Sequence, residues 1–248
     1  MLLFTSALRQ AAGLLLMAVA APVFGVACVI LLPSRRLRIR LCNFFGHVFG
    51  RLVLRICSAR VDARAKDAMD AVFPAIYVSN HTSPLDIFLG IWLSPYGVVG
   101  IAKKEVVYYP FFGQLYWISG HLRIDRKDHG KAVEALRDTA EMVRRERLGL
   151  WLWPEGTRSK DGRLLPFKKG FAHLAIATGL PVVPVVITGA HRGWRKNSFL
   201  IEACTIGVQV LPPIATDGWT VATLDAHVET VRAAFLAALP EDQRTTVG

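Results

Sequence analysis

A histidine and an aspartate five positions apart, His81 and Asp86, are the residues of this chain best suited to acid–base chemistry. They flank a polar turn in which Pro84 suits the first position of a helix and Ser83 its N-cap. A plain helix would place the two side chains on different faces, but a turn followed by a helix N-terminus can bring them together. Asp86 would then accept from one ring nitrogen of His81, and the other nitrogen could take a proton from a hydroxyl group. The competing interpretation is an ordinary capping sequence beside a surface histidine.

Backbone N–H groups at this helix N-terminus are also candidates for binding an anion or an oxyanion. A base and its orienting carboxylate are sufficient when the nucleophile is a substrate hydroxyl, so no catalytic serine is required. The sequence lacks the G-x-S-x-G motif of serine hydrolases, which makes a lipid hydrolase the weaker alternative.

Three further segments carry polar or special residues that could complete a site. The run Trp153–Ser159 follows an apolar strand-like stretch, and Arg158 within it could grip a phosphate with both ends of its guanidinium. Lys104 and Arg126 could add phosphate contacts, and the run Val183–Val185 is an apolar strand containing a proline. Taken singly, each of these is an ordinary turn, charged edge or core strand.

The segments lie between strands and helices that are predicted to alternate along the chain from about Val61. Such alternation predicts an α/β layered domain. A linker is expected between Ala59 and Asp70, and the polar tail after Pro240 is expected to be disordered. The predicted strands are Val72–Val78, Tyr96–Ala102, His121–Ile124, Leu148–Trp153, Pro181–Ile187 and Thr205–Leu211, and the predicted helices are Pro84–Leu93, Pro110–Ser119, His129–Glu146, Lys168–Thr178 and Thr223–Leu239.

Together and in this order, the four segments resemble the glycerolipid acyltransferase family that includes the 1-acyl-glycerol-3-phosphate acyltransferases. The resemblance covers about residues 72–190, and Trp153 departs from it where phenylalanine is commoner. The matching residues are Asn80, His81 and Asp86, then Gly113, Gly120, Asp125 and Arg126, then Pro154 to Ser159, and finally Val183 to Val185.

The resemblance implies an α/β fold with a central mixed sheet flanked by helices and preceded by N-terminal membrane helices. It also implies transfer of a fatty acyl group from a thioester, on coenzyme A or acyl carrier protein, to the hydroxyl of lysophosphatidic acid or another lysolipid, without a metal or a cofactor. The implied roles are His81 as general base, Asp86 as its orienter, and Val183 to Val185 as part of the acyl or acceptor pocket. The implied acceptor-binding residues are Glu155, Gly156, Thr157 and Arg158, with Lys104 and Arg126 assisting Arg158 at the phosphate.

Residues 11–33 contain no charged side chain and are long enough to cross a bilayer as a helix. Pro22 and Gly25 interrupt the run, so a re-entrant or interfacial segment is an alternative, and a signal peptide is a third. Basic residues follow directly, beginning with Arg35 and Arg36, which argues against cleavage and favours the cytoplasmic face of a membrane, the inner membrane in a bacterium.

Residues 41–57 show apolar side chains at helical spacing, interrupted by Arg51 and Arg55. This pattern fits an amphipathic helix at the membrane interface or, equally well, a helix packed on the core. Gly46 and Gly50 form a G-x-x-x-G motif, which is weak evidence for helix pairing in so short a segment.

Composition narrows the class of partner. The 248 residues carry a formal net charge of +11, with 52% hydrophobic and 20% charged residues. An anionic partner is therefore expected, and the position of the charge beside apolar sequence favours lipid headgroups over nucleic acid. The four cysteines lack zinc spacing and are expected to be reduced thiols. We expect a membrane-associated helical segment at 1–60, a catalytic domain at 61–240 and a polar tail at 241–248.

Overall fold

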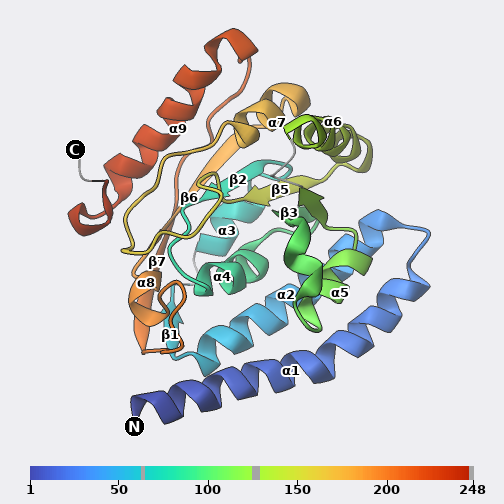
Figure 1. Cartoon of the computed structure of the whole chain (residues 1–248). Helices are drawn as coiled ribbons and strands as arrows, with labels where there is room; N and C mark the ends of the chain where they lie inside the picture. The colour runs from blue at the N-terminus through green and yellow to red at the C-terminus, as the bar shows by residue number, and fades with distance from the viewer. Residues whose placement is uncertain (63–64, 125–128, 246–248) are drawn as a thin grey trace.

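A seven-stranded mixed sheet forms the centre of the molecule in the computed structural model, which describes residues 1–62, 65–124 and 129–245 (Figure 1). The strands are arranged in the order β1-β7-β6-β2-β5-β3-β4. Their bounds are β1 Ala59–Val61, β2 Ile76–Ser79, β3 Val98–Lys103, β4 Leu122–Ile124, β5 Gly149–Leu152, β6 Val182–Thr188 and β7 Cys204–Val210. The expected α/β class with a central mixed sheet is confirmed.

The direction of the strands decides where a site can form. Strands β6, β2, β5, β3 and β4 run parallel, whereas β7 is antiparallel to β6. The carboxyl ends of β2, β5 and β3 therefore meet at one edge, where ligands bind in open α/β sheets. The segments that carry His81, Glu155 and Lys104 each begin at this edge, directly after one of these strands.

Helices cover both faces of the sheet, as Figure 1 shows. Side chains alternate along β2, so Ile76 and Val78 pack against α6, α7 and α9, whereas Tyr77 faces α2 and α4. The helices are α1 Leu2–Ile30, α2 Arg35–Ile56, α3 Ala65–Asp70, α4 Leu85–Leu93, α5 Phe112–Ile118, α6 His129–Glu146, α7 Gly170–Thr178, α8 Ala190–Gly193 and α9 Leu224–Ala238, with 3₁₀ turns η1 Lys104–Tyr108, η2 Val221–Thr223 and η3 Glu241–Gln243.

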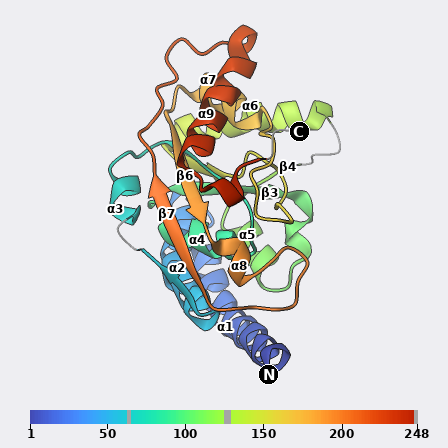
Figure 2. The same ribbon diagram turned by 90° about the vertical axis from the view of Figure 1, so that its left-hand side faces the viewer.

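Two expectations about the ends of the catalytic domain are wrong. The predicted linker contains β1, which pairs with β7, and helix α3. The tail is ordered as far as Thr245, because Gln243 is buried and its side chain bonds the backbone of Gly189 and Gly162. Figure 2 shows the chain returning after α9 towards α8.

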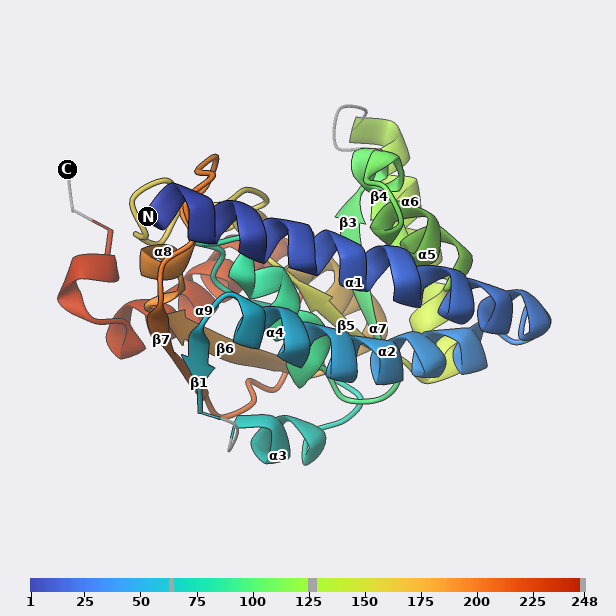
Figure 3. The same cartoon turned by 90° about the horizontal axis from the view of Figure 1, so that it is seen from below.

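Helix α1 lies along the underside of the domain, beside α2 (Figure 3). Near its start, Arg9 donates to the carbonyl oxygen of Ile201 at 2.7 Å. Beyond its end, Arg35 and Arg38 of α2 donate to the carbonyl oxygens of Gly120 and Ile118. Among the described residues, α1 is the one helix that is long and apolar enough to cross a membrane by length and composition.

Helix α2 is mainly a core helix, the second of the two alternatives that its pattern left open. Its glycines form the contact with α4: a Cβ built on Gly46 would lie 2.8 Å from the Ile91 carbonyl oxygen, and one on Gly50 2.5 Å from that of Phe88. The weak G-x-x-x-G signal therefore marks a real close approach of two helices. Outward side chains such as Phe44 remain exposed.

Gly50→Ala should lower the free energy of unfolding by about 1–3 kcal/mol, because the new methyl group meets backbone that cannot move aside. Gly13→Ala is the matched control, since nothing lies within 4 Å of a Cβ there. It should be neutral or stabilise by about 0.5–1 kcal/mol through helix propensity. Denaturant unfolding of the detergent-solubilised protein measures both, and equal effects would contradict the packing argument.

Candidate active site

His81 and Asp86 lie in direct contact, as their spacing allowed. The Nδ1 atom of His81 is 3.0 Å from Oδ2 of Asp86, and the aspartate side chain is fully buried. Nδ1–H donating to the carboxylate leaves Nε2 as the nitrogen that can accept a proton. The histidine side chain is 12% exposed, so a substrate can reach it while bulk water is largely excluded.

Asp86 also organises the turn that carries the histidine. Its Oδ2 accepts from the backbone N–H groups of Thr82 and Ser83, at 2.6 and 2.8 Å. The helix begins one residue later than expected, because Pro84 occupies the N-cap position in place of Ser83. The Ser83 hydroxyl accepts from Leu85 N–H and donates to the carbonyl oxygen of Trp194.

The expectation that N–H groups of this turn hold an anion or an oxyanion is not met in this geometry. Those of Thr82 and Ser83 bond Asp86, that of Leu85 bonds Ser83, and the next two along α4 bond backbone carbonyls. The N–H of His81 donates to Glu155. Every backbone donor of the turn therefore already has a partner.

The asparagine before the histidine fixes the turn to the sheet. Asn80 is buried, and its side-chain amide both donates to and accepts from the backbone of Ile187 in β6, at 2.8 Å each. The Val183–Val185 run lies in the same strand. Val183 and Val185 are fully buried in the core, and the run does not line the cavity described below.

The second polar segment is bonded to the backbone of His81 on both sides. Oε1 of Glu155 accepts from His81 N–H at 2.7 Å, and Ser159 N–H donates to the His81 carbonyl oxygen at 2.8 Å. Oε2 of Glu155 accepts from Leu165 N–H. Since β2 and β5 are neighbours, these bonds join the two loops that follow them.

Burial raises the pKa of Glu155 from 4.5 to about 8, although its two backbone hydrogen bonds oppose that shift. The native state therefore binds a proton that the unfolded chain releases between these pH values. Its contribution to stability is present below about pH 4.5 and is lost as the pH rises towards 8.

Glu155→Gln should destabilise the protein by about 1–3 kcal/mol at low pH, because its amide NH₂ can face a backbone donor. The difference in unfolding free energy between wild type and variant should narrow as the pH rises from about 4.5 to 8, since only the glutamate titrates. Urea unfolding across this window measures the gap. Glu202→Gln, at an exposed site, is the control, and a pH-independent gap for Glu155→Gln would contradict the expectation.

The loop after Glu155 contains Gly156, which was predicted from the sequence, and lies beside two lysines that sequence reasoning missed, Lys168 and Lys196. Gly156 has φ +70°, and a Cβ there would lie 3.1 Å from the Lys168 ammonium nitrogen. The Lys196 ammonium donates to the Thr157 hydroxyl at 3.0 Å and to the Arg158 carbonyl oxygen at 2.7 Å. The basic run from Arg192 to Lys196 was the signal available in the sequence.

Three predicted site residues remain, Lys104, Arg126 and Arg158. Lys104 opens η1 and is exposed directly after β3. Arg126 lies outside the described residues. In the part of the chain that the structure describes, the guanidinium of Arg158 pairs with no carboxylate. Contact of these residues with a substrate stays a prediction.

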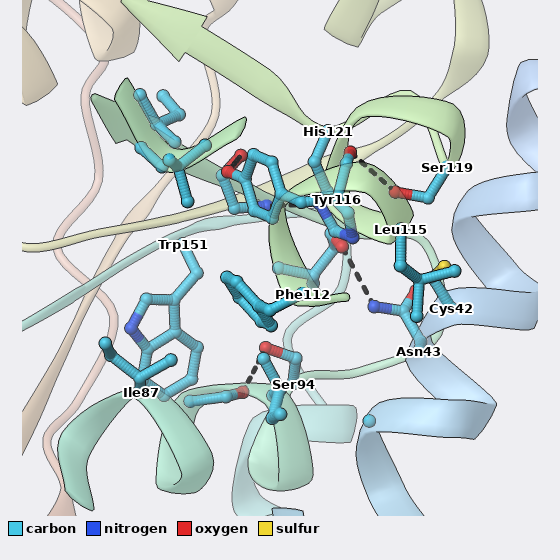
Figure 4. A pocket seen from close by; sticks show the side chains of 18 of the residues that line it. Cys42, Asn43, Ile87, Ser94, Phe112, Leu115, Tyr116, Ser119, His121 and Trp151 are labelled. Atoms are coloured by element: carbon cyan, nitrogen blue, oxygen red, sulfur yellow. Dashed lines mark hydrogen bonds between the residues drawn. The ribbon is translucent and has the colours of Figure 1, made fainter. Parts of the chain in front are cut away.

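An apolar cavity lies beside the histidine, separated from it by Trp153. The Trp153 ring stacks on His81 with centroids 4.7 Å apart, and the same ring lines the cavity. The cavity volume is about 140 Å³. Figure 4 shows Phe112, Leu115 and Tyr116 of α5 facing Trp151 across it.

A histidine oriented by a buried aspartate, at the carboxyl edge of the sheet, is suited to activating a hydroxyl group as a nucleophile. A family model described as Acyltransferase matches residues 60–188. The 1-acyl-sn-glycerol-3-phosphate acyltransferase of Limnanthes douglasii is 44% identical over 91% of this chain and 80% of its own length. The Escherichia coli enzyme of the same name is 33% identical over 80% of this chain and 81% of its own.

The crystal structure of the 1-acyl-sn-glycerophosphate (LPA) acyltransferase PlsC from Thermotoga maritima has the same fold. Its TM-score is 0.74 at 22% identity, covering 97% of this chain and all of that one. The chain belongs to the 1-acyl-sn-glycerol-3-phosphate acyltransferase family, which confirms the resemblance seen in the sequence.

Proposed function

We propose that the protein transfers a fatty acyl group from an acyl thioester to the sn-2 hydroxyl of lysophosphatidic acid, producing phosphatidic acid. The observation that carries the proposal is the His81–Asp86 pair. It presents one basic nitrogen beside the loop that carries Arg158 and beside an apolar cavity. A lysolipid offers a hydroxyl, a phosphate and an acyl chain to these three features.

In this reaction the acceptor hydroxyl oxygen attacks the thioester carbonyl carbon while Nε2 of His81 takes its proton. The carbon–sulfur bond then breaks, and the imidazolium returns the proton to the leaving thiolate. Asp86 holds the ring and stabilises its positive charge between the two steps. The reacting groups belong to His81, Asp86, the acceptor and the thioester, so the proposed mechanism includes no metal or cofactor.

Arg158 is the proposed anchor of the acceptor phosphate, with Lys104 and Arg126 assisting. Arg158→Ala should raise KM for the acceptor about 10–100-fold with a smaller change in kcat, as expected for the loss of a charge-assisted hydrogen bond. Lys160→Ala is the matched control, since it removes an exposed cation two positions further along the same loop. An unchanged KM for Arg158→Ala would refute the phosphate role.

The apolar cavity is the proposed site for an acyl chain. Its walls come mainly from α2, α4, α5 and β3. Figure 4 labels apolar side chains from three of these elements, Cys42 of α2, Ile87 of α4, and Phe112 and Leu115 of α5. A fatty acyl chain fits such a lining because its burial releases apolar surface from water.

We propose that α1 lies in one leaflet and does not span the bilayer. Its exposed face is apolar, including Leu14, Leu15 and Val19, while its start is bonded to the catalytic domain through Arg9. A perpendicular helix would have to break this contact or pull polar structure into lipid. The basic flank supports a position of the domain at the cytoplasmic surface.

The test is transfer of label from radioactive lysophosphatidic acid into phosphatidic acid, with acyl coenzyme A and acyl-acyl carrier protein supplied in separate reactions. Product with either donor supports the proposal, and a comparison of the two identifies the donor. Activity only on acceptors that lack a phosphate monoester would replace lysophosphatidic acid with another lysolipid. Release of free fatty acid without acceptor would instead identify a hydrolase.

A further inference from the structure

The segment from η1 to α5 presents an unusual concentration of aromatic side chains to the outside. Tyr108 is 80% exposed and Trp117 59%, and Tyr109 and Phe111 between them are also exposed. Tyrosine and tryptophan combine an apolar body with a polar group, and they concentrate at the headgroup level of membranes. We call these four residues the aromatic patch.

The opposite side of the same segment is apolar as well. Val106, Phe112, Leu115 and Tyr116 line the cavity beside the active site (Figure 4). An element that separates an apolar cavity from water normally carries polar residues outside. Apolar residues on both sides are expected when the outer side contacts lipid.

The aromatic patch is continuous with the apolar surface of α1. Helix α5 packs against α1, and Figure 3 shows the two side by side. The carbonyl oxygens of Ile118 and Gly120, at the end of α5, accept from Arg38 and Arg35. A bilayer that receives the exposed face of α1 therefore reaches this segment too.

Charge selects lipid over a second copy of this chain as the group that covers the patch. Between Val106 and Gly120 the sequence has no charged residue, and Lys103, Lys104 and Glu105 precede it with a net charge of +1. Basic residues bordering an aromatic surface match anionic headgroups. A second copy would bring its own net charge of +11 towards these lysines.

We propose that η1 and α5 form a second membrane-contacting element, in which the rings of Tyr108, Tyr109, Phe111 and Trp117 insert at the headgroup level of the bilayer that receives α1. The proposal rests on the proposed function in one respect, that the enzyme works on lipids at a membrane surface.

The test is tryptophan fluorescence of the full-length protein in vesicles of phosphatidylcholine and phosphatidylglycerol whose acyl chains carry bromine. Bromine quenches tryptophans that contact lipid, and Trp117→Phe should lose most of the quenched emission. Trp219→Phe is the matched control, because Trp219 stacks on His227 of α9, on the face of the sheet away from α1. Its quenched emission should equal that of wild type.

Equal quenching in wild type and Trp117→Phe would overturn the proposal, as would a stable dimer in the same vesicles that Trp117→Asp converts to monomers. The fluorescence needs no turnover. Lost activity on lysophosphatidic acid with intact Trp117 quenching would therefore reject the proposed function alone, and the converse result would reject only the second membrane contact.

Discussion

His81→Ala should reduce acyl transfer by about 10²–10⁴-fold, the usual contribution of a general base. Without the imidazole, the acceptor hydroxyl must attack with its proton still attached, and the thiolate must leave unprotonated. The loss should appear in kcat, because no contact of His81 with the acceptor phosphate or acyl chain is proposed. Initial rates with saturating acceptor and thioester measure it.

The fold should survive this change. The N–H and carbonyl oxygen of His81 hold Glu155 and Ser159 through the backbone, which alanine keeps, and Asp86 retains the N–H groups of Thr82 and Ser83. His227→Ala on α9 is the control and should keep full activity. A rate for His81→Ala within a few-fold of wild type, in a folded sample, would exclude the histidine as base.

Asp86→Asn should lower kcat by about 10²–10⁴-fold with little change in KM, in line with the loss seen when the orienting aspartate of a catalytic histidine is neutralised. The amide carbonyl oxygen can still accept from Thr82 and Ser83 and from Nδ1 of His81. The turn should therefore persist. What is lost is the negative charge that stabilises the imidazolium formed during transfer.

Asp86→Ala separates this electrostatic effect from a structural one. It leaves two buried backbone N–H groups without an acceptor, so it should also lower the free energy of unfolding by about 1–3 kcal/mol for each of them. Asp86→Asn should be much closer to wild type in thermal unfolding. Equal destabilisation of the two variants, or a large rise in KM for Asp86→Asn, would assign Asp86 to the structure of the turn alone.

Much of the fold was predictable because its elements carry local signals. The apolar strand runs and the periodic helices were located to within a few residues, with three exceptions: β2 begins later than predicted, and α1 and α2 begin earlier than the runs at 11–33 and 41–57. Short elements that depend on distant partners were missed: β1 exists because β7 lies beside it, and η3 exists because Gln243 reaches the backbone of Gly162 and Gly189. Such contacts leave no periodic pattern in the sequence.

The family and the fold class could be recognised from the sequence, and the pairing of His81 with Asp86 could be predicted from it, because the motifs, the alternating elements and the turn are local features. The role of the second motif depended on the tertiary structure. Glu155 bonds the backbone of His81 because β5 lies next to β2 in the sheet, an order set by burial across the whole domain and not by spacing. The same long-range packing places Lys196 under the Arg158 loop and Gly50 against α4.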